Sequence, residues 1–112
     1  MTHLNDTQTA LIDEAHLDRQ TMGDVRLADE LLSMFVLQLE AASREIGGAS
    51  PERRIALAHS LKGTARSLGI KAVADCALDL ETSLPDPTAV ERLSRLTTCL
   101  RNEVDGRRPQ PG

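Results

Sequence analysis

The chain has 112 residues with a formal net charge of −4, and 40% of them are apolar, with one Phe and no Tyr or Trp. This length is typical of one domain of roughly 100 to 150 residues, and a core of Leu, Ala, Val and Ile favours a helical bundle over a β-sandwich. The mixed charge, and the presence of only one aromatic side chain of the Phe, Tyr or Trp type, argue against nucleic-acid binding. No apolar run reaches the ~20 residues that span a bilayer, and no signal-peptide pattern is present, so we expect a cytoplasmic protein.

Two helices are predicted in the first half of the chain. After a flexible N-terminus of residues 1–9, the apolar residues at 11, 12, 15 and 17 indicate a short helix that lies across one end of a bundle. From Asp24 to Ile46, apolar residues recur at steps of three and four, which is typical of a long amphipathic helix. Asp24 is its expected N-cap, and Gly47-Gly48 follows its end.

Three further helices follow with short connections. Ser50 and Pro51 are the expected N-cap and first residue of the next helix, which stops near Gly69. A helix with the stripe Val73, Ala77, Leu80 and Leu84 then runs to Pro85, and Asp86 caps a last helix that reaches Val104. We therefore predict an all-α, antiparallel up-and-down four-helix bundle with a short additional N-terminal helix. The domain covers residues 10–105, and residues 106–112 form a disordered tail.

The cysteines and two of the three histidines have ordinary roles in this interpretation. Cys76 and Cys99 lie in apolar-periodic stretches and are expected to be core thiols, not a disulfide or metal ligands. His3 and His16 are expected to be a terminal and a surface residue, and the three histidines do not have the spacing of a zinc site. No metal site is predicted.

His59 differs because it lies opposite the apolar stripe of its own helix. Successive residues of an α-helix are about 100° apart, which places Leu57, Leu61 and Leu68 within roughly 20° of the direction opposite His59. The imidazole is therefore predicted to point at solvent. Without further context, a solvated surface histidine of no consequence is the default interpretation.

The neighbours of His59 on the outer face make that default unattractive. Gly63 lies one turn after His59, and glycine in a helix interior costs ~1 kcal/mol relative to alanine, so the position indicates a need for space. Ala56, one turn before, is also small.

Lys62 and Arg66 place positive charge beside the ring, where it can balance a phosphoryl group, although alone they would simply be a solvated face. Neutral imidazole is a competent nucleophile near neutral pH. The pattern indicates a phosphate carrier.

The segment from Ala58 to Gly69, AHSLKGTARSLG, resembles the signature of histidine-containing phosphotransfer domains, in which His-x-Leu-Lys-Gly is followed by a second glycine six residues after the first. The resemblance covers about residues 10 to 104. It implies that His59 accepts a phosphoryl group from the aspartate of a response-regulator receiver and passes it to another receiver. It also implies that Glu81, on the adjacent helix, orients the imidazole; the alternative for Glu81 is a surface carboxylate paired with a basic neighbour.

The same resemblance implies the partners and the chemistry. The expected partners are receiver domains and a (hybrid) histidine kinase, and the carrier is expected to be a monomer. It would bind no cofactor of its own, while Mg²⁺ is expected on the partner receiver. The sequence has no glycine-rich phosphate loop, so we expect a phosphotransferase or phosphocarrier without autokinase activity or ATP binding.

A docking surface is a further expectation. In the long helix, Met34, Val36 and Leu37 fall beside or opposite the core stripe. Those exposed near His59, together with Leu11 or Ile12, could form the apolar patch on which a receiver docks.

Two other functions remain open at this point. One is a helical adaptor that uses the same face without being phosphorylated, against which the intact His59, Lys62 and Gly63 argue. The other is the dimerisation and phosphoacceptor domain of a histidine kinase, which usually follows its histidine with an acidic residue and soon a proline. Ser60 follows His59 here, and no proline follows it within the helix.

Overall fold

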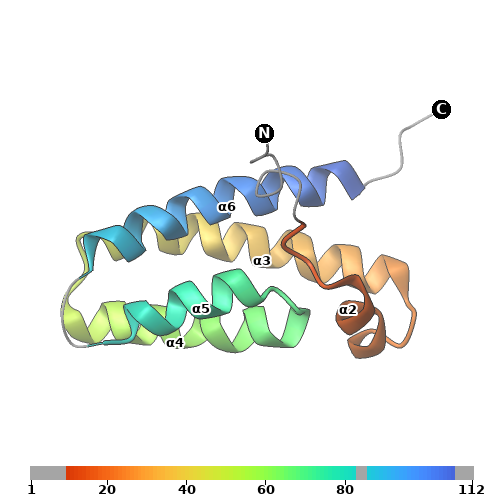
Figure 1. The fold of residues 1–112 in the computed structure, drawn as a ribbon, viewed down its shortest axis with the longest axis horizontal. Helices are drawn as coiled ribbons and strands as arrows, with labels where there is room; N and C mark the ends of the chain where they lie inside the picture. Colours follow the sequence, from red (N-terminus) through yellow and green to blue (C-terminus); the bar gives the residue numbers. More distant parts are fainter. Residues whose placement is uncertain (1–9, 83–85, 108–112) are drawn as a thin grey trace, which may run out of the picture.

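The computed structural model describes residues 10–82 and 86–107, which form the helices α2 (Glu14–Gln20), α3 (Val25–Ile46), α4 (Pro51–Leu68), α5 (Lys71–Leu80) and α6 (Pro87–Arg107). Each of the four longer helices packs against the next one in the chain, and α6 returns to α3, so they close an up-and-down bundle. In Figure 1, α3 and α6 form one pair and α4 and α5 the other. The predicted all-α bundle is confirmed.

The helices begin where the sequence places an N-cap. The side chains of Asp24, Ser50 and Asp86 each accept the backbone N–H three residues later, at 3.0, 3.2 and 3.2 Å respectively. These bonds satisfy donors that the first turn of a helix otherwise leaves unpaired. At the other end of α4, Gly69 adopts a left-handed φ of 78° and ends the helix. The caps therefore fix the register of α4, which carries His59.

The hydrophobic core is aliphatic apart from Phe35 and Cys76, as the composition indicates. Every described helix contributes a large, fully buried side chain: Leu17, Phe35, Leu61, Leu80 and Leu93. Burying such side chains is the dominant stabilising contribution to a bundle of this kind. No helix in the described part of the chain is both long and apolar enough to cross a membrane.

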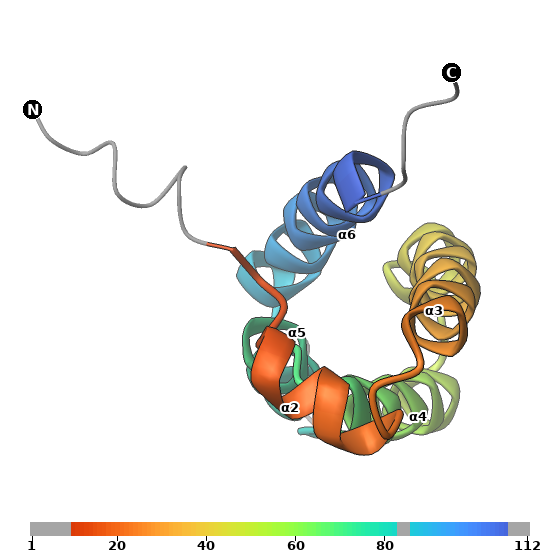
Figure 2. The same cartoon turned by 90° about the vertical axis from the view of Figure 1, so that its right-hand side faces the viewer.

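The short helix α2 lies across one end of the bundle, as predicted, in front of α4 and α5 in Figure 2. Asp13 caps it, and the backbone N–H of Asp13 donates to the carbonyl of Gly69 at 2.9 Å. The His16 ring lies against the same turn, with Nε2 3.0 Å from the carbonyl of Ser67. A Cβ on Gly69 would lie 3.0 Å from the His16 ring. The turn after α4 is thus fixed by its own backbone and by α2.

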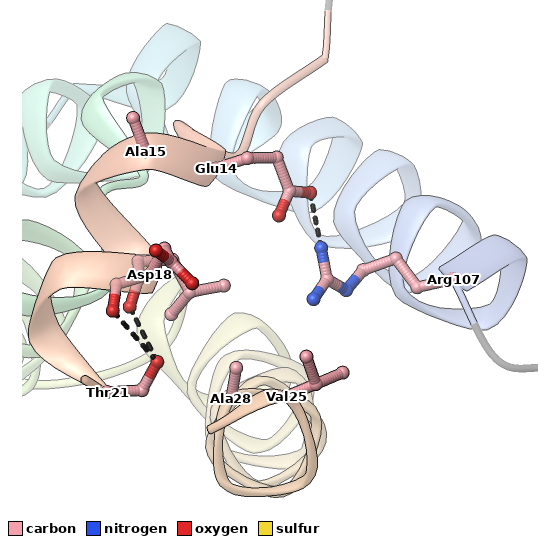
Figure 3. Close-up of a pocket in the computed structure, with 8 residues that line it drawn as sticks. Glu14, Ala15, Asp18, Thr21, Val25, Ala28 and Arg107 are labelled. Carbon is pink, nitrogen blue, oxygen red and sulfur yellow. Dashed lines mark hydrogen bonds and ion pairs between the residues drawn. The ribbon is translucent and has the colours of Figure 1, made fainter. Parts of the chain in front are cut away.

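The last helix extends beyond its predicted end. The sequence predicts a disordered tail from Gly106, but α6 continues through Arg107, which is only 19% exposed. Its guanidinium pairs with Glu14 on α2 and with Asp29 on α3, the latter at 3.1 Å. Arg107 and Glu14 line a hollow of about 340 Å³. Figure 3 shows the Arg107 side chain pointing toward Glu14. Ion pairs to two other helices hold the end of α6, which composition alone did not indicate.

Two other predicted boundaries differ or cannot be compared. The helix predicted to include Leu84 ends at Leu80, with Glu81 as its C-cap, and Leu84 lies outside the described residues. The predicted flexible N-terminus, residues 1–9, and residues 108–112 of the predicted tail also lie outside them.

Candidate functional site

His59 lies in the middle of α4 and points away from the core. Its side chain is 74% exposed, whereas Ala58 and Leu61 on either side of it are buried. The helix is well fixed at this point, because its opposite face packs on α5 and α3. The outward orientation predicted from helical periodicity is present in the structure.

Glu81 lies directly beside the imidazole. It is the C-cap residue of α5, and its Oε2 is 2.8 Å from His59 Nδ1. The Glu81 side chain is only 17% exposed, so this carboxylate is held between the helices and does not extend freely into solvent. The contact implied by the family resemblance is therefore present.

Lys62 is placed differently from its expected position. Its side chain is 16% exposed, and its ammonium group donates to Oε1 of Glu81. The alkyl stem of a lysine can lie along the helix surface while its charge reaches a partner several ångströms away. Lys62 thus pairs with the carboxylate that contacts His59 and does not stand free beside the ring.

These contacts fix the chemistry of the two ring nitrogens. Hydrogen bonds from Lys62 and His59 hold the pKa of Glu81 below its usual range, so the carboxyl group is ionised at neutral pH. An ionised carboxylate can only accept hydrogen bonds, so Nδ1 of His59 carries the hydrogen. In the neutral ring, Nε2 then carries the lone pair, on an imidazole that is mostly exposed.

The space beside the ring is open on the Gly63 side. A Cβ added at Gly63 would meet no atom within 4 Å. Ala56 and Arg66 are exposed on the same face of α4, and Arg66 forms no ion pair within residues 10–82 and 86–107. The structure therefore brings His59 and Lys62 together through their contacts with the Glu81 carboxylate. Gly63, Ala56 and Arg66 are exposed on the same helix and take no part in these contacts.

A groove runs between α3 and α4 next to Gly63. It has a volume of about 580 Å³, and its lining is mainly apolar: Leu31, Met34, Phe35, Gln38, Gly63, Thr64, Ser67 and Leu68. Gln38 also links the two helices, since its Nε2 donates to the hydroxyl of Ser60, the residue after His59, at 3.1 Å. An apolar hollow with a few polar groups, on the helix that carries His59, is suited to contact with another protein.

Only part of the predicted docking patch is exposed next to Gly63. Met34 is 65% exposed and lines this groove. Val36 and Ile12 are buried in the core. Ile12 also lies before the first residue of α2, so it is not part of the short helix that was predicted to contain it. Leu37 is exposed but lines another groove, between α3 and α6.

Arg54 was not identified from the sequence, although it lies close to the site. It is 6% exposed, with Nε 3.3 Å from the carbonyl of Leu80 and Nη2 2.7 Å from the carbonyl of Thr82. A signal existed: Arg54, Leu61 and Leu68 are spaced by seven residues, which places a cation on the apolar stripe.

The cysteines are not both core residues. Cys76 is buried, with its thiol near the carbonyl of Ala89, but Cys99 is exposed. Apolar periodicity did not separate the two because Cys99 borders the stripe of α6. Among residues 10–82 and 86–107, no group of three or more His, Cys, Asp or Glu side chains is arranged to hold a metal ion.

Comparison with known protein families gave one match. A family model described as Hpt domain matches residues 2–107, which is nearly the whole chain. Searches of curated proteins and of solved structures gave no significant match.

Proposed function

The chain belongs to the Hpt domain family, whose role is histidine phosphotransfer in phosphorelays, and from this we propose that it accepts a phosphoryl group on His59 from a receiver aspartate and passes it to a second receiver. The observation that carries the proposal is the contact between Nδ1 of His59 and the Glu81 carboxylate at 2.8 Å. It leaves the Nε2 lone pair directed outward on a ring that is mostly exposed.

The transfer step follows from this geometry. Nε2 attacks the phosphorus of the receiver's aspartyl phosphate; the N–P bond forms as the P–O bond to the aspartate breaks, and the aspartate leaves as a carboxylate. The ring gains positive charge in this step, and the Glu81 carboxylate at Nδ1–H stabilises it. Transfer to the second receiver is the reverse reaction, so the same positioning serves both directions.

Two cations can balance the charge of the phosphoryl group, one paired with a carboxylate and one exposed without an ion pair in the described part of the chain. Lys62 is paired with Glu81, and a phosphoryl group on Nε2 would compete with that carboxylate for the ammonium. Arg66 is exposed on the same face, without an ion pair in the described part of the chain. We expect Mg²⁺ to be supplied by the receiver, and the exchange to take place in the cytoplasm with this chain as a monomer.

The decisive test is transfer of label from a phosphorylated receiver. The protein is incubated with ³²P-labelled receiver and Mg²⁺, and acid-labile label on this chain is measured. Label should appear on the wild-type chain and be absent from His59→Gln, while His16→Gln, which changes the other described histidine, should retain it. No label with any receiver of the source organism would contradict the proposal and favour an adaptor that binds without being phosphorylated.

We further propose that the receiver docks over the groove between α3 and α4. Met34 and Leu37 provide a matched pair, because they lie on the same helix with exposed fractions of 65% and 67%, yet only Met34 lines the groove beside Gly63. Met34→Ala should slow transfer, and Leu37→Ala should leave it unchanged. Equal effects of the two substitutions would argue against docking at this groove.

A further inference from the structure

Arg54 is a buried cation without a carboxylate partner in the described part of the chain. Burying a guanidinium is unfavourable unless its N–H groups are hydrogen-bonded. Here the compensation comes from two backbone carbonyls. Arg54 belongs to the first turn of α4, and its acceptors are the carbonyl of Leu80, the last residue of α5, and that of Thr82, which directly follows the C-cap residue Glu81.

The two acceptors lie on either side of Glu81. The last carbonyls of a helix have no intrahelical donor and carry partial negative charge. A cation at this end of a helix therefore both donates hydrogen bonds to these carbonyls and interacts favourably with the helix dipole. The guanidinium is a rigid planar group that donates hydrogen bonds to the carbonyls of the residues immediately before and after Glu81, from Nε at 3.3 Å and from Nη2 at 2.7 Å. The backbone of Glu81 is thereby tied to α4, the helix that carries His59.

We propose that Arg54 is a positioning residue for phosphotransfer: it acts through Glu81, whose carboxylate it holds at the distance that fixes Nδ1–H of His59. The proposal rests on the proposed function of His59 for its kinetic consequence only. Arg54 itself does not contact His59. Its effect on the ring is transmitted by the short turn at Glu81, whose own N–H donates to the carbonyl of Leu78 at 3.1 Å.

The spectroscopic test measures the imidazole directly. The ¹⁵N chemical shifts of Nδ1 and Nε2 of His59 report which nitrogen carries the hydrogen in the neutral ring. The wild-type protein should be mainly in the Nδ1–H form, and Arg54→Met should shift the population toward Nε2–H. Arg53→Met is the matched control, because Arg53 is the exposed neighbour and pairs with Glu45 at 2.6 Å, away from the ring. It should leave the tautomer unchanged.

The kinetic test uses the same variants with the phosphorylated receiver. Arg54→Met should slow transfer to His59 roughly 10-fold, a loss typical of residues that orient a reactive group through a second side chain. Arg54→Lys retains the charge but cannot span both carbonyls, so it should give a smaller change in the same direction. It also keeps the test valid if Arg54→Met does not fold.

A double variant separates positioning from general destabilisation. In a Glu81→Ala background the carboxylate is absent, so adding Arg54→Met should cause no further loss of transfer. The proposal is overturned if the tautomer and rate of folded Arg54→Met or Arg54→Lys equal those of wild type, or if Arg54→Met slows the Glu81→Ala protein as much as the wild type. The tautomer measurement needs no phosphorylation, so it decides the role of Arg54 even if His59 never accepts label.

Discussion

Replacing Gly63 should stabilise the protein and, with a large side chain, impair its activity. Gly63 lies inside α4, and a Cβ there would meet nothing within 4 Å, so substitution introduces no clash. Glycine to alanine in a helix interior gains ~1 kcal/mol of unfolding free energy, and leucine retains most of that gain. In a domain of this size, ~1 kcal/mol raises the melting temperature by about 4 °C.

The same leucine would project beside the ring into the space where a receiver must approach. A loss of only ~1.4 kcal/mol of transition-state stabilisation slows transfer tenfold, and we expect Gly63→Leu to slow it by at least that factor. Thermal unfolding followed by circular dichroism measures the stability, and the time course of label transfer measures the rate. Gly63→Ala should show the gain in stability with a smaller loss of rate.

Gly106 supplies the control, since it is also helical and a Cβ there would also meet nothing within 4 Å. Gly106→Leu should raise stability less, because it lies in the last turn, and should leave transfer unchanged. The reasoning would be refuted if Gly63→Leu transferred phosphate as fast as wild type. It would also be refuted if Gly63→Leu were less stable than wild type, because Gly63 would then be required by packing and not by access.

Three other predictions concern the charges and thiols. Hydrogen bonds from Lys62 and His59 hold the pKa of Glu81 below the usual 4.5, so the ionised Glu81 carboxylate stabilises the fold above pH 4.5, and this stabilisation is lost as the pH falls through the lowered pKa. The free energy of unfolding, measured in urea from pH 7 to 3, should therefore depend less on pH in Glu81→Gln than in the wild type. Arg107→Ala should lower the unfolding free energy by roughly 1 kcal/mol, against less than ~0.5 kcal/mol for exposed Arg95→Ala, as measured by urea denaturation. Cys99 should react with a thiol reagent in the folded protein, whereas Cys76 should react only after unfolding, since burial blocks access and raises the pKa of its thiol.

The helices were predictable because their signals are local. Asp24, Ser50 and Asp86 cap the helices they were expected to cap, and the apolar stripes identify the buried faces. The end of a helix was less predictable where contacts with other helices determine its position. Arg107 is ordered by carboxylates on α2 and α3, which no property of residues 106–112 could indicate.

The site was predictable to the extent that it depends on one helix. The outward direction of His59 and the open space at Gly63 follow from the periodicity of α4. The contact with Glu81 came from the family resemblance, because no local pattern relates residues on different helices. The positions of Lys62 and Arg54 could not be predicted for the same reason. Their partners lie on or just after the end of α5, and a long side chain can reach a partner well outside its own helical face.

The two glycines of the motif have opposite relations to stability. Gly69 has a left-handed φ and no room for a Cβ beside His16, so the fold itself requires glycine there. Gly63 has neither constraint, and the fold would be more stable without it. A relative that had ceased to carry phosphate would therefore be free to lose its first glycine while keeping the second. The residue at the position of Gly63 would then distinguish relatives that carry phosphate from relatives that have the same fold but no longer carry it.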